Sequence, residues 1–423
     1  MRVLYDISTL GLGRRYVQSR GGSYRADRHI TEGLLASEEC DLIFCANHSS
    51  VAYEGCLEYL DAHPRLHHVP LIGPRDAWLV PAMRRVISRA HRVARRVAGS
   101  NVLPGGLRQG GIVLDRRIHP PVGDASPPAD IFHSPGTPLP PLTQCRAPKR
   151  VLTIYDLSYT RFPEIYGPAY ARAARAAIDS IRPGDWVLTS SESIRAELCE
   201  FGVAAPPHVA VVPLAADRGT FYPCSDDVKI QAVRRRYAIP PGSYILTVNS
   251  PDPRKNLARA IRAFAALIRQ QRIDDLSFVM AGNTGPGSDI ITSTVAECSD
   301  VRGRFVATGY IADEDLAALY CGATMFVYPS SYEGFGLPLL EAMQCGIPVI
   351  AINASSMAEV VGDAGLLVDP ADDDALAAAM LNLYCDAQAR ERLRRKSLAR
   401  AARFSWERTT QQLLKVYRDV LDG

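Results

Sequence analysis

The stretch TMFVYPSSYEGFGLPLLEAMQCGIPVIAI, residues 324–352, contains a complete strand–loop–helix–strand unit. TMFVYPS and IPVIAI are short apolar runs typical of buried strands, and PLLEAMQCG between them has a helical composition. Pro338 suits the first position of a helix, and Gly346 followed by Pro348 ends it. Two strands joined through a helix lie parallel in one sheet, so this stretch predicts an α/β fold.

The same alternation of strands and helices continues on both sides of this stretch. RVLYDI, DLIFCA, RVLTIYDL, DWVLTSS and HVAVVPLA form one series, and SYILTVNS, SFVMAG, RFVATGY, TMFVYPS, IPVIAI and AGLLVDP form a second. Two such series in 423 residues predict two doubly wound, Rossmann-like domains. We place the first domain at residues 1–220, the second at 221–403, and a C-terminal helix at 404–423 that packs back on the first domain.

Composition excludes several classes of protein. Hydrophobic residues make up 47% of the chain, and the formal charge is only +3, so no strong field favours nucleic acid. Ten cysteines occur without a C-x-x-C pair, which indicates reduced thiols rather than a metal site or disulfides. No apolar run reaches the roughly 18 residues of a membrane span. These features predict a cytoplasmic protein.

Residues 80–98 form the most basic segment of the chain. PAMRRVISRAHRVARRVAGS has an apolar stripe beside a face of arginines, within an otherwise Gly- and Pro-rich region. Such a helix suits an anionic membrane surface, which would place the protein peripherally at the inner face of the membrane. A helix packed on its own domain with solvated arginines is the alternative.

Glu333 and Glu341 flank the Gly-Phe-Gly turn in the opening stretch. In open α/β sheets ligands bind beyond the carboxyl ends of the strands, where the loop with Glu333 lies. Amides at a helix start suit a phosphate, and a carboxylate accepts two hydroxyls of a vicinal diol. Glu341, expected in the first helical turn, would bind a ribose and Glu333 a second polyol. The alternatives are that Glu333 is a solvated loop charge and that Glu341 only favours the helix dipole.

ILTVNSPDPRKNL, residues 245–257, carries a second set of charges after a strand. Arg254 and Lys255 precede Asn256, a plausible helix N-cap. Two cations are badly placed for a helix N-terminus, so stability does not explain them. A bound diphosphate would explain the two cations, because both side chains could bind its oxygens.

Four segments together resemble family 4 glycosyltransferases: SPDPRKNL, ATGYIADEDLAALY, VYPSSYEGFGLPLLEAMQCGIPVIA and AEVVGDAGLLVDP. The two glutamates match the E-x7-E motif of that family. RGGSYR, DIFHSPGTPLP and VLTIYDLSYTRFPE resemble, more loosely, bacterial mannosyl- and rhamnosyltransferases of surface polysaccharide synthesis. The resemblance implies a GT-B fold, retention of anomeric configuration and no metal or other cofactor. It also implies a nucleotide-sugar donor in the cleft between the domains, held mainly by the nucleotide-sugar domain at residues 221–403, and an acceptor bound by the acceptor domain at residues 1–220.

The resemblance also implies roles for individual residues. Arg254 and Lys255 would bind the donor diphosphate, Glu333 the transferred sugar and Glu341 the ribose. Gly21 and Gly22 would form a glycine loop that lets the backbone approach the phosphate, and Tyr310 and Ile311 would line the base site. The remaining donor contacts would come from Ser250 and from the amides of Gly334, Phe335, Gly336 and Leu337.

The chain departs from the family pattern at two positions. Tyr155 stands where many relatives have a histidine that contacts the sugar, so Tyr155, Asp156 or His133 would take that catalytic role. A histidine after a strand is also often structural. Asn249 stands at the position of a family arginine. The acidic clusters at residues 313–315 and 372–374 are expected to be helix caps rather than metal ligands.

These features predict a retaining hexosyltransferase of bacterial surface polysaccharide synthesis. Mannose or a 6-deoxyhexose such as rhamnose would move from a GDP-sugar to a glycan or polyprenyl-diphosphate-linked acceptor. Glu333 would act as a nucleophile or as a positioning group, two roles that the sequence does not separate. The alternatives are a transferase using a UDP- or dTDP-sugar and an inactive scaffold that binds sugar nucleotides.

Overall fold

A computed structural model describes residues 1–15, 21–46, 50–72, 127–141, 146–203, 208–283, 285 and 287–423. These residues form two compact units. The first contains Met1–Thr189, Leu198–Ala210 and Thr410–Gly423, and the second contains Ser190–Glu197 and Val211–Thr409. The basic helix predicted at residues 80–98 lies outside the described residues, so its membrane role stays a prediction.

The first unit is built on a seven-stranded sheet in the order β3-β2-β1-β4-β5-β6-β7. Neighbouring strands pair in parallel, for example β1 with β2 and β4. The five predicted strands are all present, whereas β3 and β4 were not predicted as strands. The strands are β1 (Arg2–Asp6), β2 (Asp41–Cys45), β3 (Leu71–Ile72), β4 (Ile131–Pro135), β5 (Lys149–Thr153), β6 (Trp186–Thr189) and β7 (Val209–Val211).

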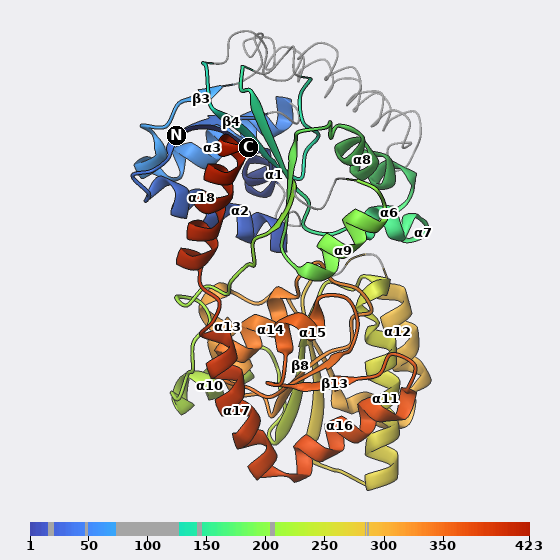
Figure 1. Ribbon diagram of the computed structural model, residues 1–423. Helices are drawn as coiled ribbons and strands as arrows, with labels where there is room; N and C mark the ends of the chain where they lie inside the picture. The colour runs from blue at the N-terminus through green and yellow to red at the C-terminus, as the bar shows by residue number, and fades with distance from the viewer. Residues whose placement is uncertain are drawn as a thin grey trace, which may run out of the picture. The chain divides into compact units, whose positions relative to one another are not determined.

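Helices and the C-terminal segment pack around this sheet (Figure 1). A Cβ atom at Gly33 would lie 2.0 Å from Oγ1 of Thr410, so glycine lets α2 approach α18 closely. Leu413, Tyr417 and Val420 of α18 are buried. The helices are α1 (Ser8–Arg15), α2 (Gly22–Leu35), α3 (Ser50–Asp61), α6 (Ser158–Arg161), α7 (Pro163–Tyr166), α8 (Pro168–Asp179) and most of α18 (Trp406–Asp422), with a 3₁₀ turn at Pro64–Leu66. The helix α9 (Glu192–Glu200) is divided between the units, and Glu192–Glu197 belongs to the second.

The second unit contains a six-stranded parallel sheet in the order β10-β9-β8-β11-β12-β13. Each of the six strands of the second predicted series is present. The four central strands, β8, β9, β11 and β12, are mostly buried apolar runs, as expected for a parallel sheet covered on both faces, whereas the edge strands β10 and β13 are partly exposed. The strands are β8 (Ser243–Val248), β9 (Leu276–Ala281), β10 (Phe305–Gly309), β11 (Met325–Tyr328), β12 (Val349–Ile352) and β13 (Leu366–Val368).

Eight α-helices of the second unit connect or flank these strands (Figure 1). The helical run predicted from residue 372 onward is broken at Asp386, whose side chain accepts a hydrogen bond from the amide of Ala389 and caps a new helix. The helices are α10 (Asp227–Arg236), α11 (Leu257–Gln271), α12 (Ser288–Glu297), α13 (Asp313–Cys321), α14 (Leu337–Gln344), α15 (Met357–Val361), α16 (Asp373–Cys385) and α17 (Ala387–Ala401), with 3₁₀ turns at Pro253–Lys255 and Ser299–Arg304. Two parallel-sheet units confirm the predicted α/β fold.

Candidate functional site

The strand order of the second sheet fixes where a ligand site is expected. The chain runs outward from β8 through β9 to β10, then returns to β11 and runs outward the other way to β13. The order therefore reverses between β8 and β11, and such a switch point opens a crevice at the carboxyl ends of the two strands. The loop after β8 carries Arg254 and Lys255, and the loop after β11 carries Glu333.

Glu333 is the centre of a buried polar cluster at this switch point. Its side chain is 8% exposed. Oε1 accepts hydrogen bonds from Nζ of Lys255 at 2.5 Å, from the hydroxyl of Ser330 at 2.6 Å and from the hydroxyl of Tyr328 at 2.9 Å. Arg254 lies 3.4 Å from Oε2 through Nη1. Glu333 is thus not a solvated loop charge, and Tyr328 and Ser330 join the site without having been predicted.

The two cations are held in place by the same loops. Nη1 of Arg254 donates to the backbone carbonyl of Tyr332 at 2.7 Å, and its Nε donates to Asp252 at 3.3 Å. Nζ of Lys255 also donates to the hydroxyl of Tyr328 at 3.0 Å. An ammonium has three donors, so one donor of Lys255 has no acceptor among the described residues. Arg254 and Lys255 are predicted to bind a diphosphate. In the structure both side chains also contact the carboxylate of Glu333.

Burial and charge oppose each other in this cluster. Burial raises the pKa of Glu333, but the charges of Lys255 and Arg254 outweigh it and bring the pKa below its ordinary value. Burial lowers the pKa of Lys255, and the attraction of Glu333 opposes that shift without cancelling it. Glu333 is therefore a carboxylate at neutral pH, held as an acceptor for hydrogen bonds.

The loop between Glu333 and α14 is oriented by hydroxyl groups. Ser355 and Ser356 donate to the carbonyl of Glu333 at 2.6 and 2.9 Å. Ser191 donates to the carbonyl of Gly334 at 2.8 Å. The backbone amides of residues 334–337 donate to no backbone acceptor among the described residues. Gly336 has a φ of 93°, which turns the chain into α14 and leaves these donors available to a ligand.

Glu341 lies deeper in the helix than predicted. Because α14 begins at Leu337, Glu341 is the fifth residue of the helix and belongs to its second turn, so the prediction of a first-turn position is wrong. The side chain is 5% exposed, and the hydroxyl of Tyr320 donates to its Oε2 at 3.2 Å. A buried, hydrogen-bonded carboxylate does not fit the simple role of favouring the helix dipole.

The other predicted donor residues occupy the same edge of the sheet with different exposure. Ser250 follows β8 and is exposed. Tyr310 follows β10 and is 57% exposed, whereas its neighbour Ile311 is 5% exposed. Asn249 is buried, and its amide donates to Thr247 at 2.8 Å. Asn256 precedes α11 with a left-handed backbone and makes no side-chain cap, so the predicted N-cap interaction is absent.

Among the three candidates for the missing histidine, His133 is held inside the first unit. It is 1% exposed. Its ring nitrogens pair with the hydroxyl of Tyr417 at 2.6 Å and with Thr153 at 2.7 Å. Burial lowers its pKa to about 3, so the imidazole is neutral. This arrangement fits the structural alternative, in which His133 joins α18 to the sheet.

Tyr155 has a buried acidic partner that the sequence analysis missed. Its hydroxyl donates to Oδ1 of Asp27 on α2 at 2.5 Å. Burial raises the pKa of Asp27 to about 8, although hydrogen bonds from Tyr155 and Thr9 oppose the shift. Oδ2 of Asp27 is buried without a partner among the described residues. No regular spacing links positions 27 and 155, so only the folded chain reveals this pair.

Asp156 and the two glycines have simpler surroundings. Oδ1 of Asp156 accepts from the amide and the hydroxyl of Ser158 at 3.0 and 2.7 Å, which fixes the start of α6. Gly21 precedes α2, where Gly22 is the first residue, and its φ of −80° is accessible to any residue. A Cβ atom at Gly21 would meet nothing within 4 Å. Neither backbone strain nor packing requires glycine here, which fits the predicted approach of a ligand to this helix start.

Both acidic clusters lie at helix starts, but only the cluster at residues 372–374 supplies a cap: the N-cap position of α13 is Ala312, which makes no side-chain cap, so the predicted capping by residues 313–315 is wrong. Asp372 caps α16 through the amides of Asp374 and Ala375. Asp315 is buried and paired with Arg236 at 2.7 Å. In the part of the chain that the structure describes, no three His, Cys, Asp or Glu residues are grouped as metal ligands.

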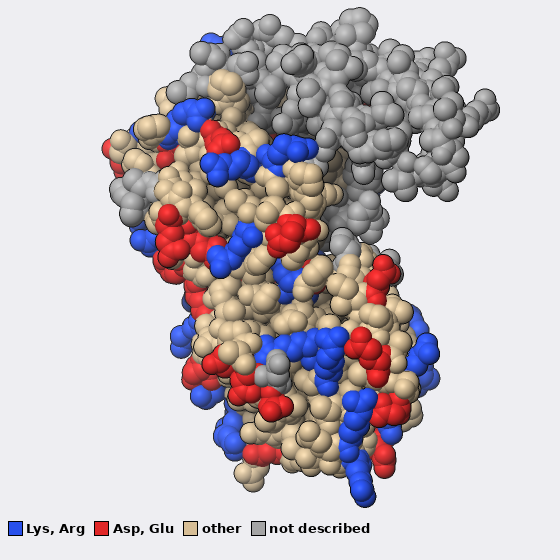
Figure 2. Space-filling model, turned by 90° about the vertical axis from the view of Figure 1, so that its right-hand side faces the viewer, with Lys and Arg blue, Asp and Glu red and all other residues tan. Residues whose placement is uncertain are grey.

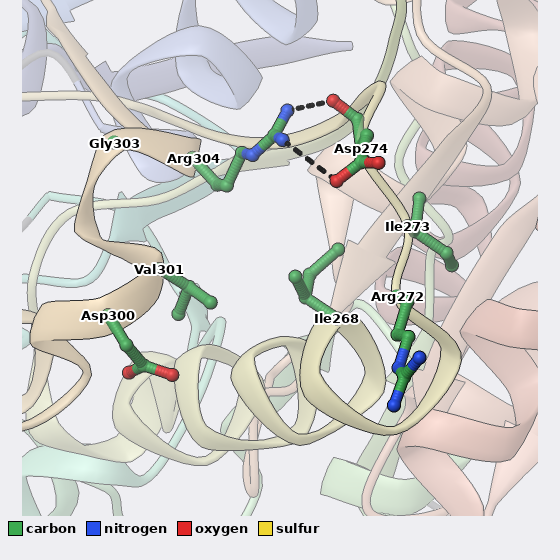
Figure 3. Close-up of a pocket in the computed structure, with 8 residues that line it drawn as sticks. All are labelled: Ile268, Arg272, Ile273, Asp274, Asp300, Val301, Gly303 and Arg304. Atoms are coloured by element: carbon green, nitrogen blue, oxygen red, sulfur yellow. Dashed lines mark hydrogen bonds and ion pairs between the residues drawn. The ribbon is translucent and has the colours of Figure 1, made fainter.

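A surface hollow of the second unit lies away from this site. It is formed by residues that precede β9 and β10, at the amino ends of the strands, and Arg304 there donates to the backbone of Asp274 (Figure 3). Asp300 in its lining pairs with Arg269 at 2.6 Å, and Arg304 pairs with Asp274 at 3.7 Å. The candidate ligand site is at the opposite edge of the sheet.

Comparison with known proteins decides the family. Residues 230–400 match the family described as glycosyl transferases group 1. The chain is 34% identical over 289 residues to O-antigen chain mannosyltransferase B of Escherichia coli, covering 68% of this chain and 74% of that protein. The chain is a group 1 glycosyltransferase of the family 4 type.

Further comparisons agree with this assignment. The glycosyltransferase is 30% identical over 242 residues to the serotype-specific mannosyltransferase WbdA of Escherichia coli, covering 56% of this chain but only 29% of that longer protein. Sucrose-phosphate synthase from Thermosynechococcus elongatus superposes with a TM-score of 0.67 at 18% identity, covering 100% of this chain and 99% of that chain. The predicted GT-B fold and hexosyltransferase class are confirmed. No helix among the described residues is long and apolar enough to span a bilayer.

Proposed function

We propose that this glycosyltransferase moves mannose, with retention of configuration, from GDP-mannose to a growing surface polysaccharide. The observation that carries the proposal is the buried cluster of Glu333, Lys255 and Arg254 at the switch point of the second sheet. Two curated relatives are named as O-antigen or serotype-specific mannosyltransferases, which supports the choice of sugar and product.

The cluster suits departure of a nucleoside diphosphate. The diphosphate would lie against the amides of residues 334–337 and the remaining donor of Lys255, with Arg254 beside them. These positive groups are fixed before the reaction, so they stabilise the charge that develops on the leaving oxygen without reorganising. In this proposal protein cations and a helix N-terminus neutralise the diphosphate, and no metal is needed.

The two glutamates would bind the two sugars of the donor. Glu333 is an ionised acceptor and would accept hydrogen bonds from hydroxyls of mannose beside the diphosphate. Glu341 would accept from the ribose diol, with Tyr320 fixing its carboxylate. Tyr310 and Ile311 would line the base site. Because Lys255 and Ser330 already bind Glu333, we favour positioning of the sugar over direct nucleophilic attack.

The test measures GDP release and sugar transfer by the full chain. Glu333→Gln should lower kcat more than it weakens GDP binding, because its proposed partner is the transferred sugar. Glu341→Ala should weaken GDP binding by about 1.5–3 kcal/mol, the value of a hydrogen bond to a charged group. Glu391→Ala, on the exposed face of α17, is the matched control and should change neither quantity.

Two outcomes would contradict the proposal. Binding of GDP-mannose without GDP release in the presence of a lipid-linked mannan acceptor would favour the inactive scaffold. Transfer from UDP- or dTDP-sugars but not from GDP-sugars would overturn the donor assignment while leaving the glycosyltransferase class intact.

A further inference from the structure

Three tyrosine rings meet on the surface of the first unit. Tyr159 of α6 and Tyr170 of α8 stack with ring centroids 5.5 Å apart and an interplanar angle of 19°. Tyr166 of α7 meets Tyr159 edge-on at 4.6 Å and 74°. Tyr159 is 40% exposed and Tyr170 is 60% exposed. We call these three residues the tyrosine platform.

The backbone around the platform is stiffened by residues with restricted geometry. Pro163 is the first residue of α7, and Pro168 is the first residue of α8. Gly167 between them has a φ of 79°, which allows the sharp turn from α7 into α8. Three rings are thus brought together from three short helices, and Tyr170 stays largely in solvent. Core packing does not account for aromatic surface left exposed in this way.

The platform follows directly from the carboxyl end of β5, the edge of a parallel sheet where ligands bind. The carboxylate of Asp156 holds the start of α6 through Ser158, at 3.0 and 2.7 Å. One residue earlier, Tyr155 is anchored to Asp27. Tyr159 is therefore carried by a segment whose base is fixed by buried hydrogen bonds, as a preformed binding surface requires.

The chemistry of the platform favours a neutral, hydroxyl-rich ligand. The face of an aromatic ring is negative, so it attracts the C–H groups on one face of a pyranose, and the tyrosine hydroxyls can bond sugar hydroxyls. The nearby charges have both signs. Glu164 of α7 stands with Arg161 of α6 and Arg172 of α8, and Arg175 pairs with Asp179 at 2.9 Å. An anionic membrane would instead favour a surface of one positive sign.

We propose that the tyrosine platform is a subsite for the acceptor glycan, which stacks a hexopyranose of the chain other than the unit being extended. This inference rests on the proposed function, because it takes the acceptor to be a polysaccharide. It adds a residue-level site in the first unit that would make longer acceptors better substrates than short ones.

The test compares acceptors of two lengths with matched variants. α-Linked mannotetraose and methyl α-mannoside would be titrated calorimetrically into the full chain without donor, and the acceptor KM of each would be measured with GDP-mannose. Tyr170→Ala should weaken tetraose binding and raise its KM about fivefold to tenfold, the value of one aromatic stacking contact. Binding of methyl α-mannoside and the KM for the donor should not change. Tyr170→Phe should keep most of the tetraose affinity.

Phe201→Ala is the control, since Phe201 is a 56% exposed aromatic residue elsewhere on the first unit. Equal losses for both acceptors, or a lowered unfolding midpoint that accounts for the loss, would show that the tyrosines only hold the helices together. Unchanged tetraose binding would overturn the subsite. If Tyr170→Ala keeps tetraose binding but loses binding to phosphatidylglycerol vesicles, the platform is a membrane contact and the subsite is refuted. Absence of GDP-mannose turnover by the wild type would refute the proposed function, whereas donor-free tetraose titration still tests the platform.

Discussion

Lys255 and Glu333 form a buried ion pair whose energetics differ from those of surface pairs. Their side chains are 11% and 8% exposed, and Nζ lies 2.5 Å from Oε1. Taking both charges out of water is costly, and their attraction with the added bonds of Tyr328 and Ser330 offsets that cost. Losing one partner is therefore worse than losing both, because the survivor remains charged and buried.

A double-mutant cycle tests this prediction. Lys255→Met should lower the free energy of unfolding of the second unit by about 3–5 kcal/mol. Adding Glu333→Gln should restore part of that loss, because the uncompensated carboxylate is removed. Denaturant titration of the four proteins gives the coupling free energy. The matched control is Lys396 with Asp363, an exposed pair at 2.9 Å, where Lys396→Met should cost less than about 1 kcal/mol. Similar losses at both pairs would refute the argument.

Asp27 makes stability depend on pH in the opposite direction to an ordinary salt-bridged carboxylate. Burial raises its pKa from 3.8 to about 8 in the folded chain. Between these values the folded state holds a proton that the unfolded state releases, so the contribution of Asp27 to stability falls as pH rises from 3.8 to 8. Asp27→Asn removes the charge and keeps an acceptor for the hydroxyl of Tyr155.

The denaturant midpoint of the wild type and of Asp27→Asn should be measured between pH 4 and pH 9. We expect the advantage of Asp27→Asn to grow up to about pH 8 and then to level off. Asp61→Asn, at an exposed position on α3, should show no such trend. Parallel pH profiles for the wild type and Asp27→Asn would mean that Asp27 is ionised in both states.

At the scale of the element, α14 is placed by the conformation of one residue. The φ of 93° at Gly336 lies in the region that other residues rarely adopt, and it sets the direction of the amides that precede the helix. A Cβ atom there would lie 3.4 Å from Leu339, which is an ordinary contact. Strain of the backbone, rather than a clash, therefore decides the effect of a substitution.

Gly336→Ala should cost about 1–2 kcal/mol of stability through this strain. The relaxed loop would misplace the amides of residues 334–337, so kcat should fall by about tenfold to a hundredfold. Steady-state kinetics and a thermal melt measure both effects. Gly303→Ala is the control, because a Cβ atom there meets nothing within 4 Å. Full activity in Gly336→Ala would show that the positions of these amides do not affect the reaction.

At the scale of the whole molecule, basic and acidic side chains alternate over the described surface in Figure 2 without a field of one sign. The formal charge of +3 agrees with this balance. A single-sign surface that would bind nucleic acid is absent from the described residues in this view. In the proposed function, we therefore expect recognition of the donor to depend on the few charges gathered at the switch point of the second sheet.

GDP at 100 times its dissociation constant should stabilise the chain by about 2.7 kcal/mol through mass action. The shift of the melting temperature with GDP, UDP and dTDP at equal concentration measures which nucleotide the chain prefers, and we expect GDP to give the largest shift. Glu341→Ala should reduce the shift by GDP, whereas Glu391→Ala should not. A larger shift with UDP in the wild type would contradict the choice of base.

The sequence by itself determined the α/β class, the six strands of the second sheet and the positions of Glu333, Arg254 and Lys255 at strand ends. These features are local, because apolar runs, helix caps and turn residues act over a few positions. Tertiary structure decided that the cations bond to Glu333, that His133 joins Tyr417 and that Asp27 meets Tyr155. It also placed Glu341 one turn further into α14 and brought Tyr159, Tyr166 and Tyr170 together. Such contacts depend on how distant segments pack in space, and neither periodicity nor spacing along the chain records that packing.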